Sequence, residues 1–161
     1  MNKPLSRQPD EVEEMIRTYG DMLFRTCLVM LQNQPDAEDA VQETVLKYML
    51  KAPTFSSPEH EKSWLLKVAA NHCRDMLRFR SRHPQITLEQ LSGYLTDPEN
   101  CGILDALMTI PEKYRIVMLL HYVEGYPTDE IAQIIGRTSS AVKMRLKKGR
   151  KLLEEAYRKE N

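Results

Sequence analysis

Seven basic residues and no acidic residue lie in the stretch from Arg137 to Lys151. Lysine and arginine side chains donate hydrogen bonds to phosphates and to base edges, so this cluster is a candidate nucleic-acid site. The simpler alternative is the solvated face of a basic helix. If the stretch is helical, most of these side chains share an outward face. The residues expected to contact nucleic acid are Thr138, Ser139, Ser140, Lys143, Met144, Arg145, Lys147, Lys148 and Lys151.

The residues around this cluster predict two helices joined by a tight turn. Thr128 is the expected N-cap of the first helix, and Gly136 stands where a helix end favours a left-handed residue. Thr138 is the expected N-cap of the second helix. The apolar seam of that helix is Val142, Leu146, Gly149 and Leu153. This pattern is a helix-turn-helix, the usual scaffold that presents a basic helix to the major groove, and it favours DNA binding over the solvated face.

A second candidate nucleic-acid face lies on a helix predicted from Glu61 to about Arg82. Its inner side carries apolar residues at helical spacing, while polar side chains project from the other side. These polar residues are Lys67, Asn71, Arg74 and Arg78. Cations spaced along successive turns can follow a single-strand backbone, and the Asn71 amide offers both a donor and an acceptor to a base edge.

The loop before this helix carries one large apolar residue. Pro53 and Pro58 bracket the segment, which cannot be helical throughout because each proline lacks an amide donor. Phe55 lies between them. It is either tucked into the domain core or exposed for a functional contact, and the sequence leaves both interpretations open.

An acidic cluster marks the start of a helix predicted from Asp36 to about Lys51. Its inner face is mostly apolar, and its outward residues near the start are Glu38, Asp39, Gln42 and Glu43. Carboxylates in a first turn suit the positive end of the helix dipole, which is the simple interpretation. The same cluster could instead dock a basic partner.

Length and composition limit the possible classes of protein. With 161 residues, 42% of them hydrophobic, the chain suits one or two small domains, and its net charge of zero means that a nucleic-acid surface requires segregation of charge. No window is apolar enough for a membrane span and no signal core is visible, so we expect a cytoplasmic protein. Cys27, Cys73 and Cys101 are odd in number and form no CxxC pair. We therefore expect buried thiols rather than a disulfide framework or a metal site.

The fold expected from these patterns is all-α, with two small helical domains joined by a flexible linker. Residues 83–102 lose helical periodicity and gather Pro, Gly, Asn and Asp, as linkers do. We predict an N-terminal domain over residues 1–82 and a C-terminal domain over residues 103–161, which contains the helix-turn-helix.

Four ordered segments span most of the chain. They are DAEDAVQETVLKYM, SWLLKVAANHCRDMLR, IPEKYRIVMLLHYVEGYPTDEIAQIIG and SSAVKMRLKKGRKLL. In this order they resemble the extracytoplasmic-function sigma factors of bacteria, from about Glu11 to Leu153. The resemblance implies two helical domains without the family's middle domain. Each would read one promoter element, and the linker between them would run through core RNA polymerase.

The resemblance also implies roles for particular residues. The positions that match the family's helix for docking on the clamp coiled coil of the largest polymerase subunit are Asp36, Asp39, Gln42 and Glu43. Asn71 matches a position that helps capture a base flipped from the non-template strand of the downstream element, beside the loop that contains Phe55. The positions that face the upstream element in the major groove are Lys143, Met144, Lys147 and Lys148. Along the helix that carries these positions, this chain differs from the residues that are usual in the family. A promoter sequence therefore cannot be transferred from relatives.

The leading hypothesis is a transcription initiation factor that makes core RNA polymerase promoter-specific and assists promoter melting. Its expected partners are core RNA polymerase, promoter DNA and an anti-sigma factor, with no cofactor, no small-molecule substrate and a monomeric free state. The alternative is a helix-turn-helix regulator that acts on a paired operator without polymerase. An enzyme has little support, because the sequence has no nucleophile–base pair, Gly-rich phosphate loop or metal-spaced His/Cys set.

Overall fold

The computed structural model describes residues 7–79 and 106–160, which fold into helices and short connections. The elements are α1 (Pro9–Leu31), α2 (Gln34–Lys51), α3 (Pro58–Phe79), α6 (Glu112–Met118), the π-helical turn η2 (Leu119–Val123), α7 (Thr128–Ile135) and α8 (Ser139–Glu160). The predicted linker, residues 83–102, lies outside the described residues, as does Cys101. No strand occurs in the described part of the chain, so the predicted all-α fold is confirmed.

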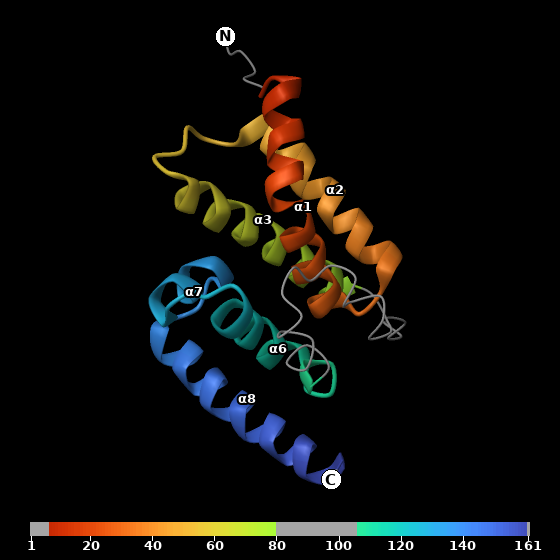
Figure 1. Ribbon diagram of the computed structural model, residues 1–161, viewed down its shortest axis with the longest axis vertical. Coiled ribbons are helices and arrows are strands. Elements are labelled where there is room, and N and C mark those ends of the chain that lie inside the picture. The colour runs from red at the N-terminus through yellow and green to blue at the C-terminus, as the bar shows by residue number, and fades with distance from the viewer. Residues whose placement is uncertain (1–6, 80–105, 161) are drawn as a thin grey trace.

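Helices α1, α2 and α3 pack against one another and form an N-terminal unit (Figure 1). Each helix turns an apolar face inward. The largest fully buried side chains of this unit are Leu23, Leu28, Met30, Leu31, Leu65 and Leu66. Full burial of one such side chain contributes about 1.5–3 kcal/mol to the free energy of folding. This shared core therefore holds the three helices together.

The starts of α2 and α3 differ from the sequence prediction. Helix α2 begins at Gln34 rather than Asp36, because the Asn33 side chain accepts a hydrogen bond from the Asp36 backbone N–H at 2.9 Å. Helix α3 begins at Pro58 rather than Glu61. In each case the helix includes a proline, Pro35 in α2 and Pro58 in α3, which lies in the first turn, where an amide donor is not needed.

The C-terminal unit is formed by α6, η2, α7 and α8, and its turn between α7 and α8 agrees with the sequence prediction. Gly136 ends α7 with a φ of 69°, in the left-handed region. The Thr138 hydroxyl accepts a hydrogen bond from the Ala141 backbone N–H at 3.1 Å, which confirms Thr138 as the N-cap of α8. Thr128 was wrongly predicted as a cap. Helix α7 starts one residue earlier than expected, so its N-cap is Pro127, without a side-chain hydrogen bond.

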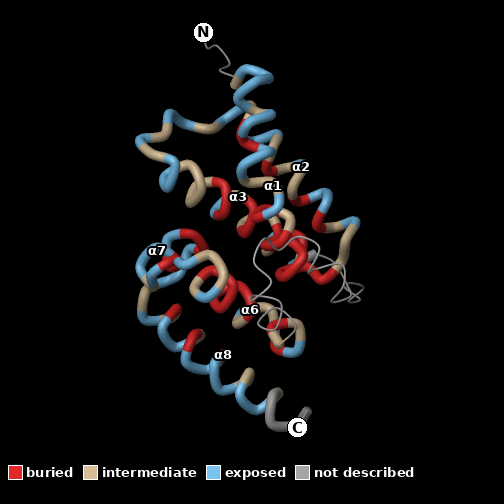
Figure 2. The backbone as a smooth tube through the Cα atoms, in the orientation of Figure 1, coloured by how far each residue is buried: buried red, intermediate tan, exposed pale blue. Residues whose placement is uncertain are grey.

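The two units lie against each other through α1 with α6 and α3 with α7 (Figure 1). Buried residues occur on the facing sides of these helices, whereas α8 has only three buried residues between positions 139 and 156, which are Val142, Leu146 and Gly149 (Figure 2). Arg115 of α6 is only 4% exposed and bridges the units. Its guanidinium donates to the backbone oxygen of Val29, at the end of α1, at 2.7 Å and to that of Ile110 at 2.6 Å.

A buried ion cluster also lies in this contact. The Glu124 carboxylate accepts hydrogen bonds from Nε of Arg25 at 2.9 Å and from its Nη2 at 2.6 Å. The Lys62 ammonium lies 3.6 Å from the second carboxylate oxygen. The units are therefore joined by charged groups as well as apolar packing.

The predicted domain limits at residues 82 and 103 fall outside the described residues and remain a prediction.

Candidate nucleic-acid and partner interfaces

The outward face of α8 carries the exposed basic side chains of the helix-turn-helix. Met144 is 71% exposed. The other exposed residues of this face are Ser140, Lys143, Lys147, Lys148 and Lys151, joined by Thr138 in the preceding turn. Ser139 and Arg145 are partly buried on its flanks. This exposure agrees with the outward face predicted from helical spacing, and contact of these residues with DNA remains a prediction.

The opposite face of α8 is held by the preceding helices. Of the predicted seam, Val142, Leu146 and Gly149 are buried, whereas Leu153 is only partly buried. The seam packs on α6 as well as on α7, and Gly149 lies against Met118 of α6. At the start of α8, the Ser139 hydroxyl donates to the Asp129 carboxylate at 2.6 Å, which ties the helix to the first turn of α7. Packing and turn geometry therefore fix the direction in which the basic face points.

The polar face of α3 is not uniformly open. Lys67 and Arg78 are exposed, whereas Asn71 and Arg74 are half-buried. The Asn71 carboxamide oxygen accepts a hydrogen bond from the Arg74 guanidinium. A Cβ atom at Gly136 would lie 3.8 Å from Nη2 of Arg74, so the turn after α7 lies directly over this part of α3.

The guanidinium of Arg74 lies close to cations of the C-terminal unit. The pKa of Arg74 is lowered, first because the guanidinium is partly buried and second because Arg137 lies nearby. Arg145 also acts on Arg74 in the same direction. Cations of both units therefore converge where α3 meets the helix-turn-helix.

Phe55 packs within an aromatic cluster rather than projecting freely into solvent. Its ring is stacked on Tyr48, with centroids 6.3 Å apart, and meets Trp64 edge-on at 5.7 Å. The Arg7 guanidinium carbon lies 5.1 Å from its centroid. Phe55 is partly buried, an arrangement between the two interpretations that the sequence left open.

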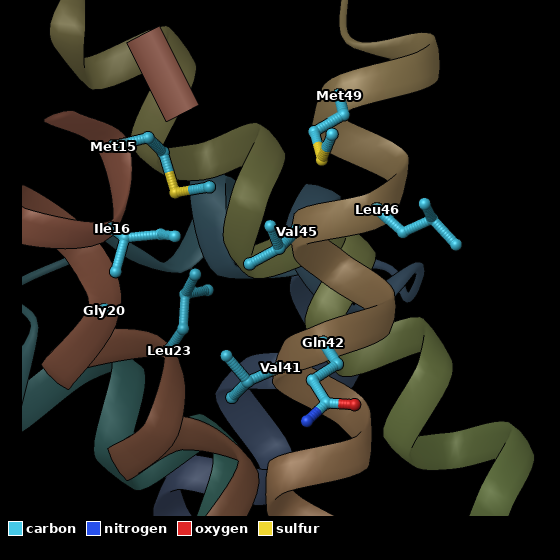
Figure 3. Close-up of a pocket in the computed structure, with 9 residues that line it drawn as sticks. All are labelled: Met15, Ile16, Gly20, Leu23, Val41, Gln42, Val45, Leu46 and Met49. Carbon is cyan, nitrogen blue, oxygen red and sulfur yellow. The ribbon is translucent and has the colours of Figure 1, made fainter. Parts of the chain in front are cut away.

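The acidic start of α2 borders an apolar groove that was not predicted. Asp39 and Gln42 are exposed, and Asp36 and Glu43 are partly buried. Beside them a groove of about 390 Å³ lies between the outer sides of α1 and α2 (Figure 3). It is lined by Met15, Ile16, Gly20, Leu23, Val41, Gln42, Val45, Leu46 and Met49. Ile16 is 46% exposed and Leu46 is 45% exposed. The apolar side chains of Ile16 and Leu46 were the sign of this groove that the sequence offered.

Within residues 7–79 and 106–160, no group of three or more His, Cys, Asp or Glu side chains is placed to hold a metal ion. In the same residues, no helix combines the length and the apolar character needed to cross a membrane. Cys27 and Cys73 are free and buried, as predicted. The pKa of Cys73 is raised, first by a hydrogen bond with Cys27 and then by burial.

Known proteins share the order of these elements. Residues 15–83 match the family Sigma-70 region 2, and residues 102–153 match Sigma-70, region 4. The RNA polymerase sigma factor SigV of Bacillus subtilis (strain 168) is 31% identical over 150 residues, which cover 91% of this chain and 90% of the relative. The ECF RNA polymerase sigma factor SigW of the same organism is 26% identical over 170 residues, with 92% and 90% coverage. The chain belongs to the extracytoplasmic-function (ECF) sigma factors.

Solved structures agree with the fold of this sigma factor. The sigma factor RpoE from Bartonella quintana, in complex with the anti-sigma factor NepR, matches with a TM-score of 0.72 and 20% identity over 94% of this chain and 98% of that chain. CnrH, in complex with the cytosolic domain of CnrY, matches with a TM-score of 0.68 and 20% identity over 96% and 92%. This sigma factor is a transcription initiation factor that directs RNA polymerase to promoters, and its family consists of regulatory factors rather than enzymes.

Proposed function

We propose that this sigma factor binds core RNA polymerase through the start of α2 and reads one promoter element with each helical unit, without catalytic chemistry of its own. The observation that carries the proposal is the exposed basic face of α8 on a helix-turn-helix. Residues 1–82 and 103–161 are the proposed domains, and the free protein is a monomer. It acts in the cytoplasm, where the polymerase and the promoters are found.

Helix α8 is the proposed reader of the upstream element. Lys147 and Met144 project from the middle of its exposed face, where a helix in the major groove meets base edges. Lys147→Ala should cost about 1–3 kcal/mol of binding free energy and change the preference at one base pair. Lys151→Ala should weaken all sequences about equally. If both variants show the same sequence-independent loss, Lys147 contacts phosphate and the base-reading assignment is wrong.

The start of α2 and the adjoining groove form the proposed polymerase-docking surface. Carboxylates of Asp39 and Glu43 attract a basic partner, and the groove beside Gln42 offers apolar area (Figure 3). Together they suit an amphipathic helix with a basic flank, such as one helix of the polymerase clamp coiled coil. Reversing charge at Asp39 and Glu43 should weaken copurification with core polymerase while circular dichroism stays unchanged. Unchanged affinity in that folded double variant would refute the docking assignment.

The polar face of α3 is proposed to bind the downstream element during melting. Asn71 has the donor and acceptor needed to hold an extruded base, and Lys67 and Arg78 are exposed on either side of it. Phe55 and Arg74 complete the proposed surface. Because the turn at Gly136 covers Arg74, α7 must move away from α3 before this face can bind a strand.

Melting by Asn71 has a direct test. Asn71→Ala should leave closed-complex formation nearly intact and reduce permanganate reactivity of melted thymines. A template in which the downstream element is already unpaired should restore activity to this variant. If Asn71→Ala melts duplex promoter as well as wild type does, the role lies elsewhere.

An anti-sigma factor is the proposed regulator. RpoE, which shares this fold, was solved in complex with the anti-sigma factor NepR, and CnrH was solved in complex with the cytosolic domain of CnrY. The proposed function as a whole is tested by transcription from a genomic library with core polymerase, with and without this protein. New start sites that share two spaced elements are the expected result. Binding of the free protein to paired operators without new start sites would support a polymerase-independent regulator instead.

A further inference from the structure

A cleft of about 360 Å³ lies between the start of α6 and the flank of α8. Its lining residues are Lys113 and Tyr114 from α6 and Ala141, Met144, Arg145 and Lys148 from α8. The cleft adjoins the exposed basic face, because Met144 and Lys148 belong to both. No residue of α6 was predicted from the sequence to contact DNA.

Close packing fixes α6 beside α8. Gly149 is buried, and a Cβ atom at this position would lie only 2.9 Å from the sulfur of Met118 on α6. Val142 and Leu146 are buried on the same side of α8. The start of α6, which carries Lys113, therefore keeps its position beside α8.

The surroundings of the cleft are mainly cationic. The Lys113 ammonium lies 5.2 Å from the centroid of the Tyr114 ring, at the edge of the cleft. The pKa of Arg145 is lowered, first by partial burial and then by nearby Arg137. Glu112 is the acidic neighbour that acts on Arg145 in the opposite direction. Cations on both walls favour an anion in the cleft.

The dimensions of DNA decide which anion this is. A helix with its side chains is about 10–12 Å across and the major groove is about 12 Å wide, so α8 fills the groove. Side chains on the flank of α8 then meet the groove wall, which consists of sugar and phosphate. We propose that Lys113 and Tyr114 bind the phosphate backbone at the edge of the upstream element and thereby set the register of α8.

This inference rests on the proposed role of α8, and its test uses the complete chain bound to core RNA polymerase. One duplex fragment carries a mapped promoter, and a second has its upstream element scrambled. Lys113→Ala should weaken binding to both fragments by the same factor and reduce the slope of log affinity against log salt by about 0.9, the value for one phosphate contact. Lys113→Arg should restore the slope. Lys51→Ala, at an exposed lysine that ends α2, is the matched control and should leave it unchanged.

A cross-linking measurement provides a second readout. The photoreactive residue p-benzoylphenylalanine in place of Tyr114 should cross-link to nucleotides that flank the upstream element. The same residue in place of Tyr122, which is 40% exposed on η2, should not. Equal cross-linking from both positions, or none from either, would overturn the proposal.

The outcomes separate this inference from the proposed function. If Lys147→Ala loses its sequence preference while Lys113→Ala keeps wild-type affinity and salt slope, the α6 contact is wrong and the α8 assignment stands. If Lys113→Ala changes the preference at one base pair, Lys113 reads a base and the backbone assignment is overturned. If wild-type holoenzyme does not distinguish the two fragments, the proposed function fails and this inference fails with it.

Discussion

Replacing Glu124 with glutamine removes the negative charge from the ion cluster between the two helical units. The Glu124 side chain is 5% exposed, and that of its partner Arg25 is 9% exposed. Lys62, the third member, is 30% exposed and retains water. The substitution keeps the shape of the side chain, so its effect reports the charge rather than a cavity.

The expected loss follows from this burial. Removing one partner of a buried ion pair costs about 3–5 kcal/mol, because the remaining charge is left buried without compensation. Glutamine keeps an oxygen that accepts a hydrogen bond from Arg25, so we expect the lower end, about 3 kcal/mol of the free energy of unfolding. A small protein has about 5–15 kcal/mol in total, so this loss is large.

Urea unfolding followed by circular dichroism measures this change. Glu130→Gln, at an exposed carboxylate in the first turn of α7, is the matched control and should lose only the helix-dipole contribution, less than about 1 kcal/mol. In the double variant with Arg25→Met, the loss should be smaller than the sum of the single losses, because neither charge then remains. Hydrogen exchange at the Gly136 turn should also rise in Glu124→Gln, since that turn lies over Arg74 in the same contact. A loss below about 1 kcal/mol would refute the argument that this cluster joins the units.

Three further changes test other parts of the structure. Gly136→Ala should lower the free energy of unfolding by about 1–2 kcal/mol, because the φ of 69° is unfavourable for a residue with a Cβ atom, and Gly136→Asn should recover part of the loss in the same urea experiment. Arg115→Ala should lower the free energy of unfolding by about 2–5 kcal/mol, because the buried backbone oxygens of Val29 and Ile110 lose their donor. A loss under about 1 kcal/mol in thermal unfolding would contradict this expectation. Limited proteolysis should cut between His83 and Gly102. The two fragments should coelute on gel filtration, because the units share a buried contact. A single uncut core would count against the proposed domain division.

The sequence by itself determined the helices and the turn of the helix-turn-helix. Gly136 and Thr138 were predicted correctly because a left-handed helix end and an N-cap depend on residues only a few positions apart. The outward face of α8 was predicted for the same reason, since helical spacing alone decides which side chains share a face. The starts of α2 and α3 were misplaced because a proline can either break a helix or occupy its first turn.

The tertiary structure alone decided how the two units meet. Arg25 and Glu124 are 99 positions apart, and Arg115 is 86 positions from Val29, so no local pattern relates them. The groove between α1 and α2 and the cleft between α6 and α8 likewise require two separate helices to be placed side by side. Spacing along one helix determines which residues share a face, whereas packing between helices determines whether that face meets solvent, DNA or another part of the same chain.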